Sequence, residues 1–585
     1  MTRWERPAAG REPAAAALLG WLADPQAPGL CLVSGSQGSG KSELLAWFVR
    51  HGSRSDVVPE RAVHAVALPA EPETAEAVSA GPLAAGPLTA GQSVLGAVWA
   101  IADQLGIVAR APGELVAALE RDARHTVIVL PDLHDADVAG FVISLAELPQ
   151  VRLIAEARSG SPAHRLLSGS PCAELDLDRA QWRDEERFAL WREAVARSPR
   201  EVQEHRSDDG AAPDLSDPVA VCEADPWKVT AAYERDTGHE HGGLRAAWLR
   251  AGQALCAESR PATRALTLLG VLGDGADPRI AVALHEAAAG ADWRMLWRRV
   301  RGDVTPPWSG PVTAAAVGQG PLAGSVVLAD AHGVVQAVSL DGAATRGRLP
   351  ELCPDPLTAS VLPDGTVLVL DDGGRVTAHS GWATRSAGSG LAGLLADGPG
   401  DTERLLDALR GQRGTALAHA AGPGPGTVAL GGADGTVRLL GDVTDAAPLH
   451  NGPVRALAVL DVPLGDGVST PLFYSGGADG AVRAWAPGSA PMAAPVLRRS
   501  SPVVCLDAAV TAGGATLVAA WGDGLVEYVG WDSGVQQTFR PGPPVRAVAL
   551  DGAGRVVIGM DEALTCLVPK QERFHEDGTQ QPPLS

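Results

Sequence analysis

The chain has 585 residues and a formal net charge of -21, from 48 Lys and Arg against 69 Asp and Glu. This length predicts several domains with cores of full size. The acidic balance argues against nucleic acid or an anionic membrane as a partner, because proteins that bind these present a basic face. No run of about twenty apolar residues occurs, so we expect no transmembrane helix.

The cysteines are odd in number, and no two have the close spacing typical of a metal site or a redox motif. Several lie in apolar runs, which favours buried free thiols in a reducing compartment and hence a cytoplasmic location. Residues 15–23 follow a few arginines and faintly resemble a signal peptide, but a glycine-rich loop follows too soon for that interpretation. We expect instead an amphipathic helix at 12–22 that leads into the first strand.

A glycine-rich loop at residues 35–42 carries the clearest motif of the chain. Its sequence, Gly-Ser-Gln-Gly-Ser-Gly-Lys-Ser, fits the phosphate-binding pattern G-x-x-x-x-G-K-[ST] at every fixed position. The apolar run 30–33 before it predicts a buried strand, and 43–49 after it predicts a helix. The alternative is a chance glycine turn, and the agreement of pattern and context favours phosphate binding.

Each residue type in the loop has a chemical reason. The glycines permit positive φ angles, and consecutive backbone N–H groups then point into one concavity at the positive end of the helix. Lys41 is expected to reach the β- and γ-phosphates, and the Ser42 hydroxyl is expected to face Mg²⁺. Lys41 is one of only three lysines in an arginine-rich chain, as expected where a compact point charge is needed. The predicted cofactor-binding residues are Gly35, Ser36, Gln37, Gly38, Ser39, Gly40, Lys41 and Ser42.

The segments that follow the loop predict an α/β domain. Residues 62–68 are expected to form a second strand, and helices are expected at 93–105 and 114–121, with Pro112-Gly113 as the breaker between them. The apolar, β-branched run 126–130 then ends in an acidic turn at 131–137. A buried strand of this kind delivers carboxylates to Mg²⁺ and to an attacking water. The alternative is an ordinary polar loop after a strand.

At this point the sequence resembles a known family. The run Val129–Asp137, V-L-P-D-L-H-D-A-D, resembles the V-L-D-D-L-H-W-A-D segment of STAND-type signalling NTPases, which have an AAA-like ATPase core. Residues 151–158 resemble the family's next core strand, which ends at a sensor arginine, here Arg158, and 173–177 resemble the strand after that. The resemblance implies binding of ATP or GTP with Mg²⁺. It assigns Ser42 and Asp132 to the metal, and Asp132 and Arg158 to catalysis.

One departure from the family concerns Pro131. The family has its Mg²⁺-ligating Asp at this position, and only the second acidic position, Asp132, is kept. Asp132 could shift toward the metal, but it would then be less available to position water. We therefore expect nucleotide to bind and hydrolysis to be slow or absent. For Arg158 the alternative is an ordinary solvent-exposed side chain.

The middle of the chain, 179–305, has helical periodicity. STAND proteins carry a helical lid, and often a winged-helix unit, after the NTPase core, so the resemblance implies these here. His285 and the arginines at 294, 298, 299 and 301 are candidates for nucleotide or acid contacts, but a solvated or interdomain helix face is the favoured interpretation. The expected helices are 179–195, 226–234, 244–257, 262–272 and 280–289.

From about Trp308 the composition changes to short alternating segments separated by Asp-Gly turns. These turns predict hairpins in which both turn residues have positive φ, and their aspartates are expected to be turn residues and not ligands. Most spacings between leading segments are about forty residues, as expected for four-stranded propeller blades. The leading segments begin at Val312, Leu357, Ala416, Val454, Val503 and Val545.

This array resembles a WD-repeat propeller, through its Asp-Gly turns and Trp485, although the Gly-His and Trp-Asp signature is mostly absent. Residues 401–410, in the one long gap, predict either a helical insertion or a degenerate seventh blade. Closing the ring requires an outer strand from one end, expected near 298–304. Propellers of this kind usually bind proteins or peptides on their flat faces.

These patterns together predict a multidomain protein. The expected parts are a P-loop NTPase domain at 1–178, a helical lid or winged-helix-like region at 179–305, a propeller at 306–570 and a polar tail at 571–585. The expected function is a nucleotide-binding signalling switch whose propeller docks a protein partner or senses a signal, with nucleotide-dependent self-assembly as a further expectation. The alternatives are a non-catalytic scaffold that binds nucleotide only for stability, a small-molecule kinase, and a DNA-binding winged helix, which the acidic balance disfavours.

Overall fold

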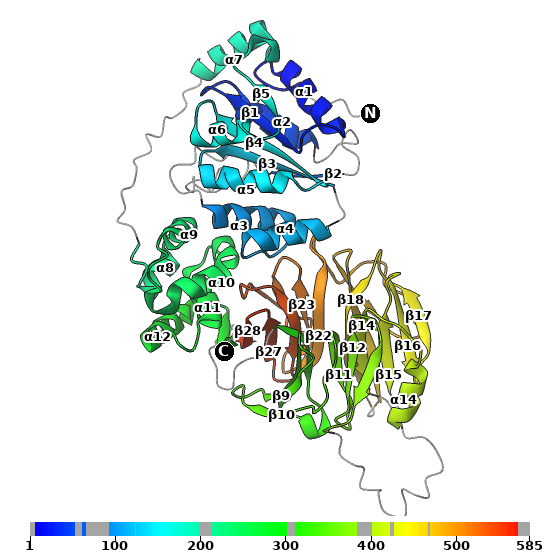
Figure 1. Ribbon diagram of the computed structural model, residues 1–585. Coiled ribbons are helices and arrows are strands. Elements are labelled where there is room, and N and C mark those ends of the chain that lie inside the picture. The colour runs from blue at the N-terminus through cyan, green and yellow to red at the C-terminus, as the bar shows by residue number, and fades with distance from the viewer. Residues whose placement is uncertain are drawn as a thin grey trace, which may run out of the picture. The chain divides into compact units, whose positions relative to one another are not determined.

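The structure is a computed structural model that describes residues 6–52, 61–65, 93–122, 125–197, 213–300, 311–382, 401–421, 426–465 and 468–570. The chain divides into two compact units, one formed by 1–264 with 276–283 and the other by 265–275 with 284–585. The first unit contains an α/β domain with a parallel sheet and the second an all-β propeller (Figure 1). This confirms the predicted fold class. The four expected domain boundaries stay predictions.

The α/β domain is built on a sheet of five strands in the order β2-β3-β4-β1-β5, and every pair of neighbours is parallel. All six residues of β1 are buried, as expected of a parallel strand that is covered on both faces. The predicted second strand is confirmed as far as Ala65, and its last three positions lie outside the described residues. The strands are β1 (Leu30–Gly35), β2 (Arg61–Ala65), β3 (His125–Leu133), β4 (Val151–Arg158) and β5 (Cys172–Asp176).

Helices cover this sheet. Cys31 and Val33 of β1 pack in one core cluster with Leu18 of α1 and Phe48 of α2, while α5 and α6 pack against each other and against β4 and β1. The helices of the α/β domain are α1 (Glu12–Ala23), α2 (Lys41–Gly52), α3 (Val94–Leu105), α4 (Pro112–Arg121), α5 (Ala136–Ala146), α6 (Pro162–Ser168) and α7 (Glu185–Arg197).

Two helix predictions need correction. Pro112 does not break a helix but begins α4, because proline at the first helical position gives up an N–H that would have no partner there. The helix expected at 179–195 is interrupted, with a 3₁₀ turn at Ala180–Trp182 before α7 begins. Asp184 causes the restart, because its side chain accepts a hydrogen bond from the Arg187 N–H at 3.1 Å.

A helical region follows, as predicted; most of it lies in the first unit, while residues 265–275 and those from 284 on belong to the second. Gln253 ties α10 to the segment after α3, since its side chain accepts from the Ala109 N–H at 3.0 Å and donates to the Ile107 carbonyl at 2.8 Å. The described residues 213–292 contain no β-strand, so they hold no wing. The helices are α8 (Pro218–Glu223), α9 (Pro226–Arg235), α10 (Leu244–Ala257), α11 (Pro261–Val271) and α12 (Pro278–Ala287).

Among the described residues the propeller has six sheets, five with four strands and one with three. The first strands of successive sheets contact one another, and the last of them contacts the first, so the ring is closed. Five of the six predicted leading positions begin these strands, and the sixth differs by one residue. The sheets are β7 (Val312–Val317), β8 (Ser325–Asp330), β9 (Val335–Ser339) and β10 (Thr345–Arg348); β11 (Pro356–Val361), β12 (Val367–Asp371) and β13 (Val376–His379); β14 (Ala416–Ala420), β15 (Thr427–Gly431), β16 (Thr436–Gly441) and β17 (Asp445–Pro448); β18 (Val454–Gly465), β19 (Val468–Gly477), β20 (Ala481–Trp485) and β21 (Leu497–Arg498); β22 (Val503–Thr511), β23 (Gly514–Trp521), β24 (Val526–Gly530) and β25 (Val535–Phe539); β26 (Val545–Leu550), β27 (Val556–Met560) and β28 (Ala563–Pro569) with β6 (Trp293–Val300).

The ring is closed by β6, which comes from the start of the propeller and pairs antiparallel with β28 at its end. Trp293 is 2% exposed, and the Trp297 indole N–H donates to the Leu340 carbonyl of the first blade at 2.8 Å. A closing strand near 298–304 was predicted, and the observed strand lies several residues earlier. The arginines at 294, 298 and 299 therefore lie on a strand and not on a helix face, and Arg301 lies outside the described residues.

The Asp-Gly turns differ from the predicted geometry. In the turn at 479–480 only the glycine has positive φ, at 69°. The Asp479 side chain instead accepts a hydrogen bond from the Ala481 N–H at 3.2 Å, and the aspartate itself does not have positive φ. The aspartates at 434 and 523 make the corresponding bonds, at 3.1 and 3.3 Å. The prediction that they are turn residues is correct, and the prediction of two positive φ angles is wrong.

The long gap between the second and third blades contains α14 (Asp401–Leu409). Leu405 and Leu409 are buried in a core cluster with Leu370 of β12 and Leu430 of β15. Of the two predicted alternatives, the helical insertion is confirmed. The described residues contain no seventh blade. In the part of the chain that the structure describes, no helix combines the length and apolar character needed to cross a bilayer.

A fragment comparison tests ring closure. We expect residues 291–570 to melt about 5–10 °C above residues 306–570, because the shorter fragment lacks β6 and the buried Trp293, whose removal costs about 3 kcal/mol. Thermal unfolding followed by circular dichroism measures this. Extending the longer fragment to residue 585 is the control and should leave its melting temperature unchanged. Equal melting of both fragments would contradict the role of β6.

Candidate functional site

The glycine loop connects the end of β1 to the start of α2, as predicted. Its glycines adopt backbone conformations that other residues avoid, with φ of 152° at Gly35, 76° at Gly38 and 83° at Gly40. A side chain would also be crowded at two of them: a Cβ on Gly35 would lie 2.6 Å from the Ser39 Oγ, and one on Gly40 would lie 3.1 Å from the Ala9 Cβ. The loop conformation therefore depends on glycine.

Two residues that the sequence analysis did not single out hold this loop. The Asp178 carboxylate, just after β5, accepts hydrogen bonds from the Ser36 N–H at 2.9 Å and from the Ser36 Oγ at 2.8 Å. Arg11 is fully buried and donates to the carbonyls of Ser39 and Leu177. Burial lowers the pKa of Arg11 to about 10, so its guanidinium remains charged at neutral pH. A lone arginine before an apolar helix carries no sequence signal for such a role.

Lys41 is directed at the loop itself. Its side chain is 9% exposed, and its Nζ donates to the carbonyls of Gly35 at 3.1 Å and Ser36 at 3.0 Å. The ammonium group therefore lies beside the loop at the N-terminus of α2, where an anion is favoured by the helix dipole and by the backbone N–H groups. A bound phosphate oxygen would replace these carbonyls as the acceptor.

Ser42 contacts Glu156, a residue that the sequence analysis did not select. The Ser42 hydroxyl donates to Glu156 Oε1 at 3.3 Å. Glu156 lies on β4 and is 3% exposed, and its other oxygen, Oε2, is buried without a hydrogen-bond partner among the described residues. Burial raises the pKa of Glu156 to about 7; the Lys41 charge opposes this rise and the Asp132 charge adds to it.

Asp132 lies in an irregular part of β3. Leu130 pairs with Ala155 and Leu133 with Ala157, so one extra residue is accommodated on β3, and Asp132 has a φ of 51°. Such a bulge re-aims side chains at a strand end. The Asp132 Oδ1 lies 3.0 Å from the Nε2 of His134, and this hydrogen bond raises the pKa of His134 against the opposing effect of burial.

The remaining acidic residues of the 131–137 turn have a structural explanation. The Asp135 side chain caps α5 by accepting hydrogen bonds from the N–H groups of Asp137 at 2.8 Å and Val138 at 3.1 Å. Asp137 lies in the first turn of α5, where a negative charge is favoured. Pro131 belongs to β3 and supplies no carboxylate. Helix capping and a first-turn position thus account for Asp135 and Asp137, while Asp132 bonds His134.

Arg158 ends β4 opposite Gly35 in the strand register and is exposed. Its charge opposes the rise in the pKa of His134. The structure therefore brings the glycine loop, Asp132 and Arg158 together at the carboxyl ends of β1, β3 and β4. It adds Glu156 to this group.

A metal at this site would depend on few protein ligands. In the described ranges no group of three or more His, Cys, Asp or Glu side chains could hold a metal ion. Mg²⁺ at phosphate sites usually takes only one or two protein ligands and completes its shell with phosphate oxygens and water. The Ser42 hydroxyl and the Oε2 of Glu156, which has no hydrogen-bond partner among the described residues, fit that requirement.

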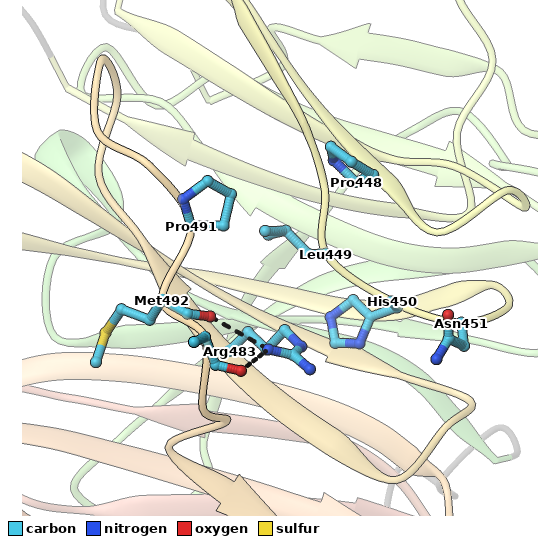
Figure 2. Close-up of a pocket in the computed structure, with 8 residues that line it drawn as sticks. Pro448, Leu449, His450, Asn451, Arg483, Pro491 and Met492 are labelled. Carbon is cyan, nitrogen blue, oxygen red and sulfur yellow. Dashed lines mark hydrogen bonds between the residues drawn. The ribbon is translucent and has the colours of Figure 1, made fainter.

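The propeller has a pocket of about 390 Å³ near the end of β17. Figure 2 shows Arg483 turned toward the chain at Met492, and its Nη1 donates to the carbonyls of Met492 at 3.3 Å and Ala493 at 3.2 Å. His450 bonds Asp479 at 3.0 Å and Ser475 at 2.9 Å. These two polar side chains therefore make contacts within the blade.

The His450 network stabilises the fourth blade. The His450 side chain is fully buried. Burial of Asp479 would raise its pKa, but hydrogen bonds from the Asn451 N–H and from His450 outweigh this effect, so its pKa lies below the usual value. The network thus pairs a charged carboxylate with a buried imidazole. Both ring nitrogens of His450 are needed, because one bonds Asp479 and the other bonds Ser475.

Comparison with known proteins identifies no family. No model of a protein family matches the chain, and no curated protein matches it. Among solved structures, the chain is similar to one described as the crystal structure of the computationally designed Ika8 protein, with 17% sequence identity and a TM-score of 0.26, covering 44% of this chain and 70% of that one. A likeness at this TM-score carries no argument about the fold or the function.

Replacing His450 by Ala should lower the unfolding free energy of the propeller by about 2 kcal/mol, because it removes the buried imidazole that bonds both the Asp479 carboxylate and the Ser475 hydroxyl. Urea unfolding of the full chain, followed by circular dichroism, measures the change. His332→Ala is the matched control, since this side chain is exposed on the first blade. An equal effect of the two substitutions would show that the network contributes nothing.

Proposed function

We propose that this chain is a nucleotide-binding switch that binds ATP or GTP with Mg²⁺ at the 35–42 loop and docks a protein partner on its propeller. The observation that carries the proposal is the arrangement at the carboxyl edge of the sheet. There a glycine loop with left-handed glycines precedes α2, and the loop Lys41 and Ser42 lie beside Glu156. Ligands of open α/β sheets bind at this edge.

Each residue of the site has a role in this proposal. The loop N–H groups and Lys41 bind the phosphates. Mg²⁺, when bound beside Ser42, would neutralise part of the phosphate charge. Ser42 is a ligand for the metal, Asp132 orients a water toward the γ-phosphate, and Arg158 contacts the phosphate from the end of β4. These roles follow the resemblance to STAND-type NTPases.

A switch also requires two arrangements that nucleotide distinguishes. The helical region packs on the α/β domain through Gln253 and through Trp99, whose ring lies against Gly252. In the proposed mechanism bound nucleotide favours one arrangement of this region, and a partner on the propeller favours the other, each by its differential affinity. The propeller partner and nucleotide-dependent self-assembly remain part of the proposal.

The second candidate is a scaffold that binds nucleotide only for stability. Pro131 favours it, because the metal-ligating carboxylate of the family is missing there. The engagement of Asp132 with His134 also favours it, since a carboxylate held by a neighbour is less available to orient water. If the protein is a switch, we expect slow hydrolysis of the bound nucleotide. If it is a scaffold, we expect no hydrolysis.

Lys41→Ala tests nucleotide binding. The substitution removes a charge-assisted contact to phosphate, so we expect the dissociation constant for ATP to rise at least about tenfold in calorimetry. Lys228→Ala is the matched control, because Lys228 is an exposed lysine of α9 in the same unit. Unchanged ATP affinity in Lys41→Ala, or no ATP binding by the wild type, would overturn the proposed phosphate site.

Asp132→Asn separates the two candidates. For the switch we expect slow hydrolysis by the wild type and a loss of at least about tenfold in Asp132→Asn, because a positioned group in the transition state is removed. ATP affinity should change little, since the loop and Lys41 are intact. Asp135→Asn is the control, as Asp135 caps α5. Bound nucleotide that is never hydrolysed by the wild type would favour the scaffold.

A further inference from the structure

We propose that Glu156 on β4 is the protein carboxylate that binds Mg²⁺ together with Ser42, in the place of the carboxylate that is missing at Pro131. This inference rests on the proposed nucleotide site and assigns its metal ligand. Neither the glycine-loop pattern nor the resemblance to STAND-type NTPases selects Glu156. The assignment comes from the position, contacts and burial of its side chain.

The position of Glu156 follows from the strand order. β4 lies between β1, which carries the glycine loop, and β3, which carries Asp132. Glu156 pairs with Val33 in β1, two residues before the loop begins at Gly35. Because the strands are parallel, a side chain near the end of β4 lies between the ends of its two neighbours. Glu156 is thereby placed under the loop rather than at the rim of the domain.

The contact with Ser42 and the burial of Glu156 together indicate that this carboxylate binds a cation. Ser42 Oγ lies 3.3 Å from Glu156 Oε1, so the hydroxyl and the carboxylate converge on one point. Glu156 is 3% exposed, and its Oε2 has no hydrogen-bond partner in the described part of the chain. A buried carboxylate oxygen without a donor is costly. A cation held jointly with Ser42 would compensate that cost.

Asp132 is less suited to this position. Its backbone has left-handed φ within the β3 bulge, and its carboxylate bonds His134 at 3.0 Å. Glu156 and Asp132 can thus divide two roles that one aspartate could not fill: Glu156 holds the metal, and Asp132 orients water. Pro131 is then tolerated, because the metal ligand comes from the adjacent strand.

A purely structural Glu156 makes a different prediction. A carboxyl group that only anchors the Ser42 hydroxyl would affect folding and loop position, with no dependence on Mg²⁺. The coupling between Mg²⁺ and nucleotide therefore distinguishes a metal-binding Glu156 from a structural one. This coupling is measured as the ratio of the ATP affinity with Mg²⁺ to the ATP affinity with EDTA. By linkage this ratio also reports how much bound ATP tightens Mg²⁺ binding.

The experiment uses the full-length chain and a fluorescent ATP analogue, titrated with Mg²⁺ and with EDTA. We expect Mg²⁺ to tighten binding to the wild type, and Glu156→Gln to lose at least about tenfold of this gain, as removal of even an outer-shell metal partner does. Affinity in EDTA should be unchanged or higher in Glu156→Gln, because a negative charge near the phosphates is gone. A general structural defect would instead weaken ATP binding both with Mg²⁺ and in EDTA.

Glu174→Gln is the matched control. Glu174 lies on β5, the other strand that flanks β1, and its Oε1 lies 3.3 Å from the Oγ of Ser34 in β1. It should leave the Mg²⁺ gain unchanged. Pro131→Asp in the Glu156→Gln background should restore the gain, because it returns a carboxylate at the family position. If Glu156→Gln does not fold, Glu156→Asp serves instead and should show a reduced gain, because its shorter side chain withdraws the carboxylate from Ser42.

Three outcomes would overturn the assignment. A Mg²⁺ gain in Glu156→Gln equal to that of the wild type would refute Glu156 as the ligand and leave the nucleotide site intact. ATP binding by the wild type that is independent of Mg²⁺ would do the same. No ATP binding by the wild type in either condition would instead refute the proposed function, and this inference with it. Mn²⁺ in place of Mg²⁺ gives a second readout, since its electron paramagnetic resonance signal should broaden with the wild type plus ATP and far less with Glu156→Gln.

Discussion

The candidate site depends on the parallel pairing of β4 with both β1 and β3. This pairing sets Gly35 beside Arg158 and places Glu156 beneath the loop that β1 carries. The pairing is itself secured by apolar side chains such as Val33, Val129 and Ile154, which share one buried cluster. The polar residues at the strand ends can therefore stay close together without contributing to the stability of the sheet, and their arrangement is fixed by the core below them.

Much of the α/β domain could be predicted because its signals are local. The strand, glycine loop and helix around 35–42 follow one another in the sequence, and the structure has each of them where the pattern predicts it. Glu156 and Arg11 could not be found this way. Glu156 sits in an apolar strand run and acquires its partner, Ser42, only through the sheet, and Arg11 reaches the loop carbonyl of Ser39 only through the fold. Contacts between residues distant in the sequence carry no local pattern.

In the propeller, too, local features could be predicted from the sequence and details of hydrogen bonding and strand pairing could not. Repeated turn chemistry was enough to predict its blades, since Asp-Gly turns recur with a regular spacing. The Asx bond at Asp479, which replaces one of the two expected positive φ angles, is a detail of hydrogen bonding that the dipeptide does not reveal. The position of the closing strand was predicted several residues late, because β6 is arginine-rich and resembles a helix face until it pairs with β28.

The pairing of β6 with β28 has a consequence for synthesis of the chain. β6 leaves the ribosome before any blade of the propeller, and its partner leaves it after all of them. Until then β6 has an unpaired edge, and the final blade cannot form by local contacts alone. Such non-local pairing slows folding, and exposed strand edges during that interval favour aggregation. A truncated product that ends before β28 would carry both liabilities permanently, so premature termination should give aggregation rather than a smaller folded propeller.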